Sequence, residues 1–328
     1  MVSRLLAVLV AAGLIVGALA TRDGMDTPGL PGADPTGTVV CATELRQVCD
    51  DLAGEDLTVR VQDAGVSLDE LATDDPPAVE AWLTLRPWPQ MVRDRREQAG
   101  LDVLLGDDSA TLAVSPLVLA VWDDRAEILT GACDPVSWRC VGDVAGGTWA
   151  DIGGPDTWGA VKPGHADPAR SAGGLLALHQ ATADRLGTTE YTRRDLDDRA
   201  FFGWFTTLQD AVPDFRPPSG SPLLAMAQVG PAAFDVVGAV EAEVLALRER
   251  AAERVGRLQV LPGGPAVTAE VVVVAVGPDT RVAERVADAA PELLAARRWD
   301  TQDGQTAQAV PSPGALEALR ATWSEVMG

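Results

Sequence analysis

A short turn of small and polar residues, "DPARSAGG" (167–174), stands immediately before an apolar segment with helical spacing. A helix that begins near Ser171 presents backbone N–H groups without partners and the positive end of its dipole, and the serine hydroxyl adds another hydrogen-bonding group. Ala172 and Gly173 keep bulky side chains away from that helix end. The turn therefore predicts close approach of a ligand to the backbone.

A second interpretation of the same turn needs no ligand. Asp167 can be the N-cap of the helix and Pro168 its first residue, because both residue types favour these positions. Capping explains the Asp-Pro pair, and it does not explain why the small residues Ser-Ala-Gly-Gly follow. The sequence supports both interpretations.

Groups that could catalyse a reaction are scarce. The sequence has no nucleophile elbow, no phosphate-binding loop and no metalloprotease helix. His165 and His179 are the only histidines; His165 has no nucleophile beside it, and His179 falls on the inner part of an expected helix. We predict that the protein is not an enzyme and uses no cofactor and no metal.

The four cysteines stand in two close pairs, Cys41 with Cys49 and Cys133 with Cys140. Four cysteines allow three disulfide connectivities, and two local loops are the simplest choice. Neither pair has the two-residue spacing of a zinc site. We therefore predict the disulfides Cys41–Cys49 and Cys133–Cys140.

The chain is strongly acidic, with a formal net charge of -22 and a sequence pI near 4.3 over 328 residues. Such a surface repels nucleic-acid phosphate and anionic membrane. Nucleic acid is excluded as a partner on this ground, and we expect a monomer.

The N-terminus predicts export. An apolar run from residue 5 to residue 20 follows Arg4 and ends in Ala18-Leu19-Ala20, the small-x-small pattern of a signal peptidase site. Residues 1–20 are thus a signal peptide or, if uncleaved, a signal anchor formed by residues 5–20. Residues 21–37 are a Pro/Gly-rich linker. The remaining chain is expected in an extracellular or cell-envelope location.

Short apolar runs alternate with helical patterns along the rest of the chain. Strands are expected at 38–42, 57–62, 78–85, 110–122, 158–162, 233–237, 257–262 and 269–276. Helices are expected at 45–52, 171–186, 196–208, 239–255 and 280–290, from Pro291 onward, and at 316–326. This alternation predicts an α/β fold with mostly parallel sheets, in which ligands bind beyond the carboxyl ends of strands.

The order of several segments resembles the solute-binding proteins of ABC importers, in the two-lobed type II arrangement of actinobacterial-type exported members. The segments are "SPLVLAVW" (115–122), "WADIGG" (149–154), "VKPGHADPARSAGGLLAL" (161–178), "GPAAFDVVGAVEAEVL" (230–245), "LPGGPAVTAEVVVVAV" (261–276) and "PSPGALEALRATW" (311–323). The resemblance implies a two-lobed periplasmic-binding-protein-like fold with a ligand cleft between the lobes. Lobe 1 would comprise residues 38–118 and the return segment 271–328 with its C-terminal helices, and lobe 2 residues 119–270.

By position, the resemblance implies a set of ligand contacts. Lobe 1 would contribute Thr43, Glu44, Thr84 and Ser115, and lobe 2 would contribute Ser171, Ala172 and Gly173, with Asp235, Gly238 and Glu241 nearby. The implied partners are a small solute, an oxyanion or a polar organic molecule, and an ABC permease. The lipobox cysteine common in Gram-positive relatives is missing, which puts the permease in question.

The charge of the ligand stays open. Helix N-termini favour oxyanions, whereas Glu44, Asp235 and Glu241 would favour a cationic or zwitterionic solute if they face the cleft. The alternative function is a surface-tethered interaction or sensory domain with the same fold and no importer. An exported enzyme ranks third, because no nucleophile–base pair is apparent.

Overall fold

The computed structural model describes residues 37–54, 56–213, 220–301 and 311–328. The chain divides into two units, 1–36 and 37–328. The predicted signal segment and nearly all of the predicted linker lie outside the described residues. Within the described ranges, no helix is both long enough and apolar enough to cross a membrane.

The second unit alternates strands and helices. The strands are β1 (Thr38–Ala42), β2 (Thr58–Gln62), β3 (Ala81–Arg86), β4 (Leu105–Asp108), β5 (Ala113–Trp122), β6 (Pro163–Gly164), β7 (Val236–Val240), β8 (Leu258–Pro262) and β9 (Thr268–Val276). The α-helices are α2 (Arg46–Leu52), α3 (Ala64–Leu71), α4 (Trp88–Gln98), α5 (Asp123–Ala132), α6 (Trp138–Val144), α7 (Ala172–Leu186), α8 (Arg193–Leu196), α9 (Arg199–Asp210), α10 (Pro222–Val229), α11 (Glu241–Arg250), α12 (Ala252–Val255), α13 (Arg281–Ala295) and α14 (Pro313–Met327). Short 3-10 turns include η1 (Thr43–Leu45), η2 (Trp149–Ile152), η3 (Asp156–Trp158) and η4 (Gly230–Ala232).

The sheet follows the order β2-β1-β3-β9-β5-β7-β6, with β4 beside β9 and β8 beside β5. Strand β1 runs parallel to β2 and β3, and β6 runs parallel to β7. Every described pairing that involves β5 or β9 is antiparallel. The α/β class is confirmed, and the sheet is mixed because two long strands run against their neighbours.

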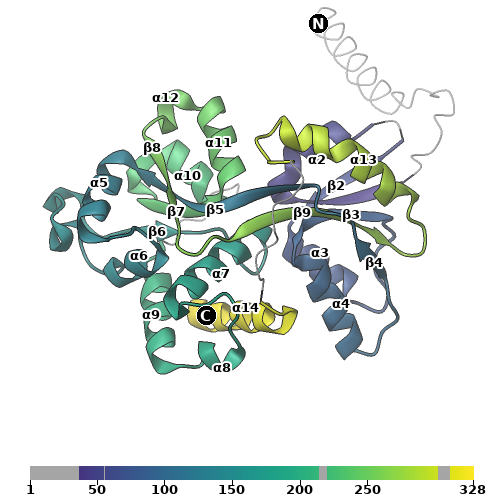
Figure 1. The fold of residues 1–328 in the computed structure, drawn as a ribbon, viewed down its shortest axis with the longest axis horizontal. Coiled ribbons are helices and arrows are strands. Elements are labelled where there is room, and N and C mark those ends of the chain that lie inside the picture. The colour runs from purple at the N-terminus through teal and green to yellow at the C-terminus, as the bar shows by residue number, and fades with distance from the viewer. Residues whose placement is uncertain (1–36, 55, 214–219, 302–310) are drawn as a thin grey trace, which may run out of the picture. The chain divides into compact units, whose positions relative to one another are not determined.

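Strand β5 divides the sheet into two parts. Its residues 113–116 pair with β9, its residues 117–121 pair with β7, and its residues 118–122 pair with β8 on the other side. We call β1–β4 and β9 with helices α2, α3, α4 and α13 lobe 1, and β6–β8 with helices α5–α12 lobe 2. Figure 1 shows β5 running from one group to the other. The chain thus passes into lobe 2 along β5 and returns through the segment between β8 and β9.

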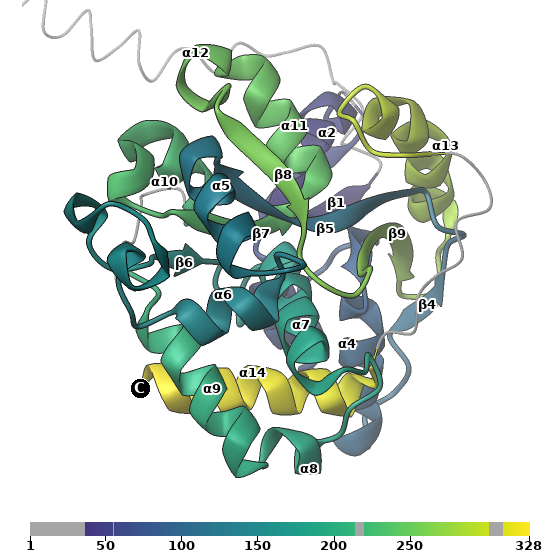
Figure 2. The ribbon, with the colours of Figure 1, turned by 60° about the vertical axis from the view of Figure 1, so that its left-hand side comes forward.

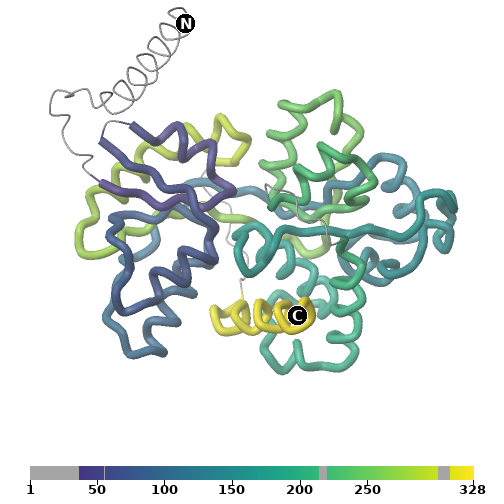
Figure 3. The backbone as a smooth tube through the Cα atoms, turned by 180° about the vertical axis from the view of Figure 1, so that it is seen from behind, coloured from purple at the N-terminus to yellow at the C-terminus, as the bar shows by residue number. Residues whose placement is uncertain are grey.

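Helix α14 contacts helices of both lobes: α4 on one side and α7, α8 and α9 on the other. It lies beneath α7 and is crossed by α9 in Figure 2, and the view from behind in Figure 3 shows its yellow tube reaching toward the blue segments of lobe 1. Its apolar positions Leu316 and Leu319 are fully buried. The last helix therefore ties the lobes together at one edge.

The core of each lobe is built on large aromatic side chains. Trp82 and Trp88 are fully buried in lobe 1, and Trp138, Trp149 and Phe205 are fully buried in lobe 2. The stripe expected at 196–208 forms two helices, because Asp198 caps α9 by accepting hydrogen bonds from the N–H groups of Ala200 (2.9 Å) and Phe201 (3.1 Å).

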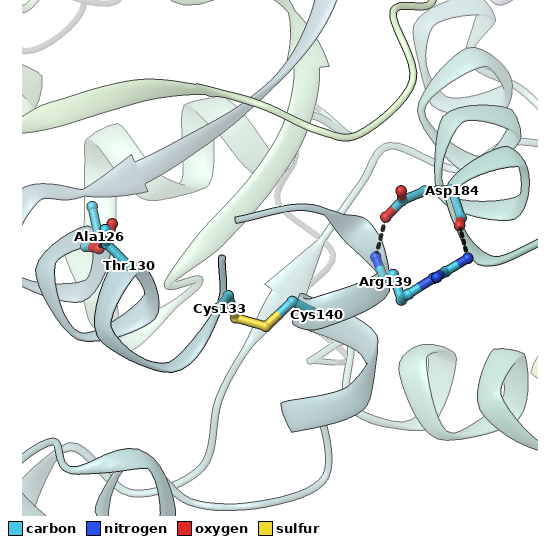
Figure 4. Close-up of a disulfide and its surroundings, with 6 residues drawn as sticks. All are labelled: Ala126, Thr130, Cys133, Arg139, Cys140 and Asp184. Atoms are coloured by element: carbon cyan, nitrogen blue, oxygen red, sulfur yellow. Dashed lines mark hydrogen bonds between the residues drawn. A yellow bond between two sulfur atoms is a disulfide. The ribbon is translucent and has the colours of Figure 1, made fainter. Parts of the chain in front are cut away.

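Both predicted disulfides are confirmed. Cys41–Cys49 joins the end of β1 to α2 with a Cα–Cα separation of 6.2 Å, and Cys133–Cys140 joins the end of α5 to α6 at 5.9 Å. Figure 4 shows the second bridge beside Arg139, whose backbone and side chain donate hydrogen bonds to Asp184 of α7. The second disulfide thus closes a loop that is also tied to α7.

Several expected elements differ from the structure. The helix expected at 239–255 begins only at Glu241 and is divided into α11 and α12. The strand expected at 158–162 is wrong: residues 156–158 form a 3-10 turn, and Gly159 adopts a positive φ of 69° that ends any extended run. The strand expected at 233–237 lies three residues later, as β7. Pro291 opens no new helix, since α13 continues through it.

Candidate functional site

The N-terminus of α7 is capped by Ser171. The Ser171 Oγ accepts a hydrogen bond from the Gly174 N–H at 2.9 Å. Asp167, the other candidate for this cap, instead closes the preceding turn, where its Oδ1 accepts from the Ala169 N–H at 2.8 Å. The helix therefore begins where the Ser-Ala-Gly-Gly sequence stands, and its first turn carries no large side chain.

A carboxylate from lobe 1 occupies this helix end. Glu44 lies in η1, directly after β1, and its Oε1 accepts hydrogen bonds from the Ser171 hydroxyl at 2.6 Å and from the Gly173 N–H at 3.0 Å. Hydrogen bonds to an ionised acceptor are short and strong, and the helix dipole adds to the attraction. The predicted residues Glu44, Ser171 and Gly173 thus meet at one point, between the two lobes.

The two glycines of the turn serve different purposes. A Cβ on Gly174 would lie 2.4 Å from the Ala166 carbonyl oxygen, so this position needs glycine for backbone packing. A Cβ on Gly173 would meet only ordinary contacts, the Glu44 Cγ at 3.7 Å and the Glu243 Oε2 at 3.8 Å among them. Gly173 therefore leaves room for two carboxyl groups.

Glu243, in the first turn of α11, is the second of these carboxyl groups, and sequence reasoning missed it. Burial and, to a smaller extent, the nearby Glu44 charge raise the pKa of Glu243 to about 8. Glu243 is therefore mostly protonated at neutral pH. The second oxygen of Glu44, Oε2, is buried and has no hydrogen-bond partner among the residues that the structure describes.

A second bridge between the lobes lies beside the first. The Thr43 hydroxyl donates to Asp63 Oδ1 at 2.7 Å, and Asp63 Oδ2 accepts from Arg170 Nε at 2.8 Å. The Gly65 N–H donates to the Arg170 carbonyl at 2.9 Å. Thr43 thus contacts lobe 2 through Asp63, and the chain that leads into α7 is held against the start of α3.

The remaining lobe 1 predictions, Thr84 and Ser115, lie inside strands. Thr84 is fully buried within β3, and its hydroxyl lacks a partner in the described part of the chain. Ser115 is buried in β5, and its Oγ accepts from the Ala242 N–H at the start of α11, at 2.9 Å. Ala172, the first residue of α7, is fully buried as well.

The structure gives Asp235 a role inside lobe 2. Its carboxylate is fully buried and accepts hydrogen bonds from Arg125 Nε (3.2 Å), Trp149 Nε1 (3.1 Å) and the Lys162 N–H (3.0 Å). The Arg125 guanidinium in turn lies 3.6 Å above the ring of Trp158. These donors neutralise Asp235, so it does not join the group at the α7 N-terminus.

Gly238 and Glu241 also lie apart from that group. Gly238 stands in the middle of β7, where a Cβ would lie 2.2 Å from the Trp138 ring, so glycine is required for packing. Glu241 lines a cavity of about 260 Å³ together with Gln180 and residues of β8. Binding of a solute by Asp235, Gly238 or Glu241 stays a prediction.

The two histidines are buried and bonded within the protein. His179 Nδ1 lies 3.1 Å from the Tyr191 hydroxyl, and burial lowers the pKa of His179 to about 4. His165 Nε2 lies 3.0 Å from Gln209 Oε1, and burial lowers its pKa as well. In the described ranges, no group of three or more His, Cys, Asp or Glu side chains could hold a metal ion.

Comparison with known proteins shows the fold. No family model matches the sequence, and no curated protein matches it. Among solved structures, the periplasmic binding protein AfuA from Actinobacillus pleuropneumoniae, bound to fructose-6-phosphate, superposes with a TM-score of 0.56 at 12% identity, covering 88% of this chain and 96% of that one. An ABC-transporter substrate-binding protein from Agrobacterium tumefaciens gives 0.54 at 12% identity, covering 91% and 96%.

The apo ferric ion-binding protein A of Pasteurella haemolytica is similar to the same extent, with a TM-score of 0.53 at 10% identity and coverage of 89% and 96%. The chain therefore has the two-lobed fold of type II solute-binding proteins, and the resemblance inferred from the sequence is confirmed at the level of the fold.

Proposed function

We propose that the protein captures a small solute between lobe 1 and lobe 2, at the N-terminus of α7. One observation carries the proposal: Ser171 and Gly173 already bind a carboxylate, that of Glu44, across the boundary between the lobes. The same hydroxyl and N–H groups can bind the anionic or polar group of a solute. Ala172 and Thr43 belong to the proposed contacts because they are the chain neighbours of Gly173 and Glu44, and Thr84 and Ser115 stay predicted contacts.

Hinge motion about the connections between the lobes would open the site. Only β5 and the segment between β8 and β9 carry the chain from one lobe to the other before α14, an arrangement that suits closure of two lobes around a ligand. The fold neighbours support this proposal, because all three are binding proteins.

The proposal extends to the setting of the protein. Residues 1–20 direct export and residues 21–37 tether the domain, so the protein works outside the cytoplasm, as a monomer, and delivers its solute to an ABC permease. The proposed bounds are residues 38–118 and 271–328 for lobe 1 and residues 119–270 for lobe 2, with α14 of the last segment also in contact with α7, α8 and α9. Binding changes no covalent bond, and the protein is not an enzyme.

A second candidate, a surface interaction or sensory domain, is favoured by one observation. Glu44 fills the place at Ser171 and Gly173 where the solute would bind, and further bonds hold the lobes together around it. A protein that had lost the function of binding a solute could keep a site that its own Glu44 side chain occupies.

A thermal-shift screen of the purified protein separates the two candidates. The panel contains sulfate, phosphate, molybdate, amino acids, polyamines and sugars. A ligand at about 100 times its Kd stabilises a protein by about 2.7 kcal/mol, which is easily measured. Solute capture predicts a saturable shift with one chemical class, weakened in Ser171→Ala and retained in the matched surface variant Ser324→Ala. No shift with any class supports the interaction domain.

A further inference from the structure

The bond between Glu44 and α7 joins a turn of lobe 1 to a helix of lobe 2. Glu44 belongs to the turn after β1 in lobe 1. The two groups that donate hydrogen bonds to it, from Ser171 and Gly173, lie at the start of α7, the longest described helix of lobe 2. The Oε1 of Glu44 engages both donors at once, at 2.6 and 3.0 Å. No solute is needed to complete this contact.

The donors that Glu44 occupies are those that an anionic solute would use. The N–H groups of a first helical turn have no partner within the helix and point toward an incoming anion. Hydrogen bonds to an ionised carboxylate are roughly twice as strong as neutral ones. Glu44 is half-buried, and its Oε2 is buried, so water screens the contact less than a surface ion pair.

Neighbouring contacts hold the segment before α7 in place and leave the Glu44 carboxylate to the helix N-terminus. Arg170, the residue before the cap, pairs with Asp63 of lobe 1 at 2.7 Å. Arg320 of α14 donates to the Ala169 carbonyl at 2.7 Å, while Glu317 of the same helix pairs with Arg95 of α4 at 2.7 Å. The segment leading into α7 is thus fixed against lobe 1 from two sides, and the α7 N-terminus faces Glu44.

We propose that Glu44 is an internal ligand of helix α7, which holds the two lobes together when no solute is bound and which an anionic solute must displace. The holding contact is a property of the chain alone; the displacement rests on the proposed function. When only a fraction of the protein is open and competent, the apparent Kd of a solute rises by the inverse of that fraction. Glu44 therefore sets the apparent affinity of the site as well as its resting conformation.

The test measures the distance between the lobes without any solute. Spin labels are attached to Val103→Cys, at a 91% exposed position between α4 and β4, and to Gln228→Cys, an exposed position on α10. Pulsed electron resonance then compares the double-labelled protein with its Glu44→Ala, Glu44→Gln and Glu97→Gln variants. Glu97 is an exposed residue of α4 and serves as the matched control.

The expected result is one narrow distance distribution for the parent and for Glu97→Gln. In Glu44→Ala the distance distribution shifts or broadens by several ångströms. Glu44→Gln keeps a neutral acceptor, so its distribution lies between those of the parent and Glu44→Ala. A Glu44→Ala distribution identical to the parent overturns the proposal. If Glu44→Ala does not fold, hydrogen exchange of the Gly173 amide is measured in the parent protein instead. Exchange at the rate of an exposed amide overturns the proposal, and strong protection supports it.

Adding anions to Glu44→Ala separates this inference from the proposed function. Acetate, sulfate and phosphate are added at equal ionic strength, with sodium chloride as the control. Return of the narrow parent distance with acetate or an oxyanion, and not with chloride, supports both the internal ligand and solute capture. An opened Glu44→Ala protein that no anion closes supports the internal ligand and counts against capture of an anion at this helix end.

Discussion

Glu44 of lobe 1 accepts a hydrogen bond from the Gly173 N–H of lobe 2 at 3.0 Å. The sequence suggested that a carboxylate near this helix end would repel an anionic ligand. The structure shows a different relationship, because the carboxylate is itself bound where the anion would be. Glu44 consequently supports the proposal that an anionic solute binds at this helix end, and it is the group that such a solute would have to replace.

Substitutions of the two glycines should separate binding from folding. Gly173→Leu is expected to displace Glu44 and to weaken solute binding at least tenfold while the protein stays folded, because the longer side chain needs the space that Glu44 and Glu243 occupy. Gly173→Ala is the matched control, since its Cβ meets only ordinary contacts, and its stability should be unchanged or slightly higher. Calorimetric titration and thermal melting measure the two effects.

Gly174→Ala should lower the stability of the folded protein, which Gly173→Ala leaves unchanged. Its Cβ would lie 2.4 Å from the Ala166 carbonyl oxygen, and overpacking of this kind costs about 1–3 kcal/mol. Chemical denaturation measures the loss. A Gly174→Ala protein as stable as the parent would show that the loop before α7 moves freely, and the account of the cap would then be wrong.

Glu243 should make stability fall as the pH rises. Between the ordinary Glu value of 4.5 and the pKa of about 8, folded Glu243 keeps a proton that the unfolded chain has lost. The unfolded state then binds fewer protons, so the free energy of unfolding decreases by up to about 1.4 kcal/mol per pH unit in this window and levels off above it. Melting curves at pH 6–8 measure the slope.

Glu243→Gln should remove this slope, and exposed Glu97→Gln should keep it. The histidines interfere little in this range, because burial holds the pKa of His179 near 4 and lowers that of His165. Equal slopes in Glu243→Gln and in the parent would contradict the assignment of the proton to Glu243.

Asp235 should matter for stability and not for direct contact with a solute. Asp235→Ala leaves the buried Arg125 with Asp124 as its acidic partner, and it removes the acceptor of the Trp149 Nε1 and Lys162 N–H groups. A buried donor left without an acceptor costs about 1–3 kcal/mol per group. Asp143, which pairs with Arg185 at 3.5 Å on an exposed face, is the matched control, and Asp143→Ala should cost about 0.5 kcal/mol or less. Urea denaturation gives both values. A small loss for Asp235→Ala would reopen a ligand role for this carboxylate.

The local features of the site and much of the fold could be predicted from the sequence. The end of β1, the disulfide to α2 and the start of α7 follow from apolar runs, cysteine spacing and a capping serine, all of which act over a few residues. What it could not supply is the pairing of Glu44 with Gly173. That contact joins residues 129 apart in the chain, and it depends on how the lobes meet.

The predictions around β7 were misplaced together. The apolar run around residue 236 was assigned three residues too early, so Gly238 was expected after the strand and not inside β7. Burial of Asp235 then came from partners far along the chain, Arg125 and Trp149. Glu243 was missed because nothing in its own helix distinguishes it from Glu241; only the approach of Gly173 does.

The most direct measurement is nuclear magnetic resonance of the 15N-labelled protein during titration with the solute panel. The account predicts that one chemical class shifts the amide signals of Gly173 and Gly174 together with those of Thr43 and Glu44, saturably, and that Gly173→Leu abolishes the shifts. A solute that binds saturably and leaves all four signals unchanged, or a panel that leaves them unchanged throughout, would contradict binding at the N-terminus of α7.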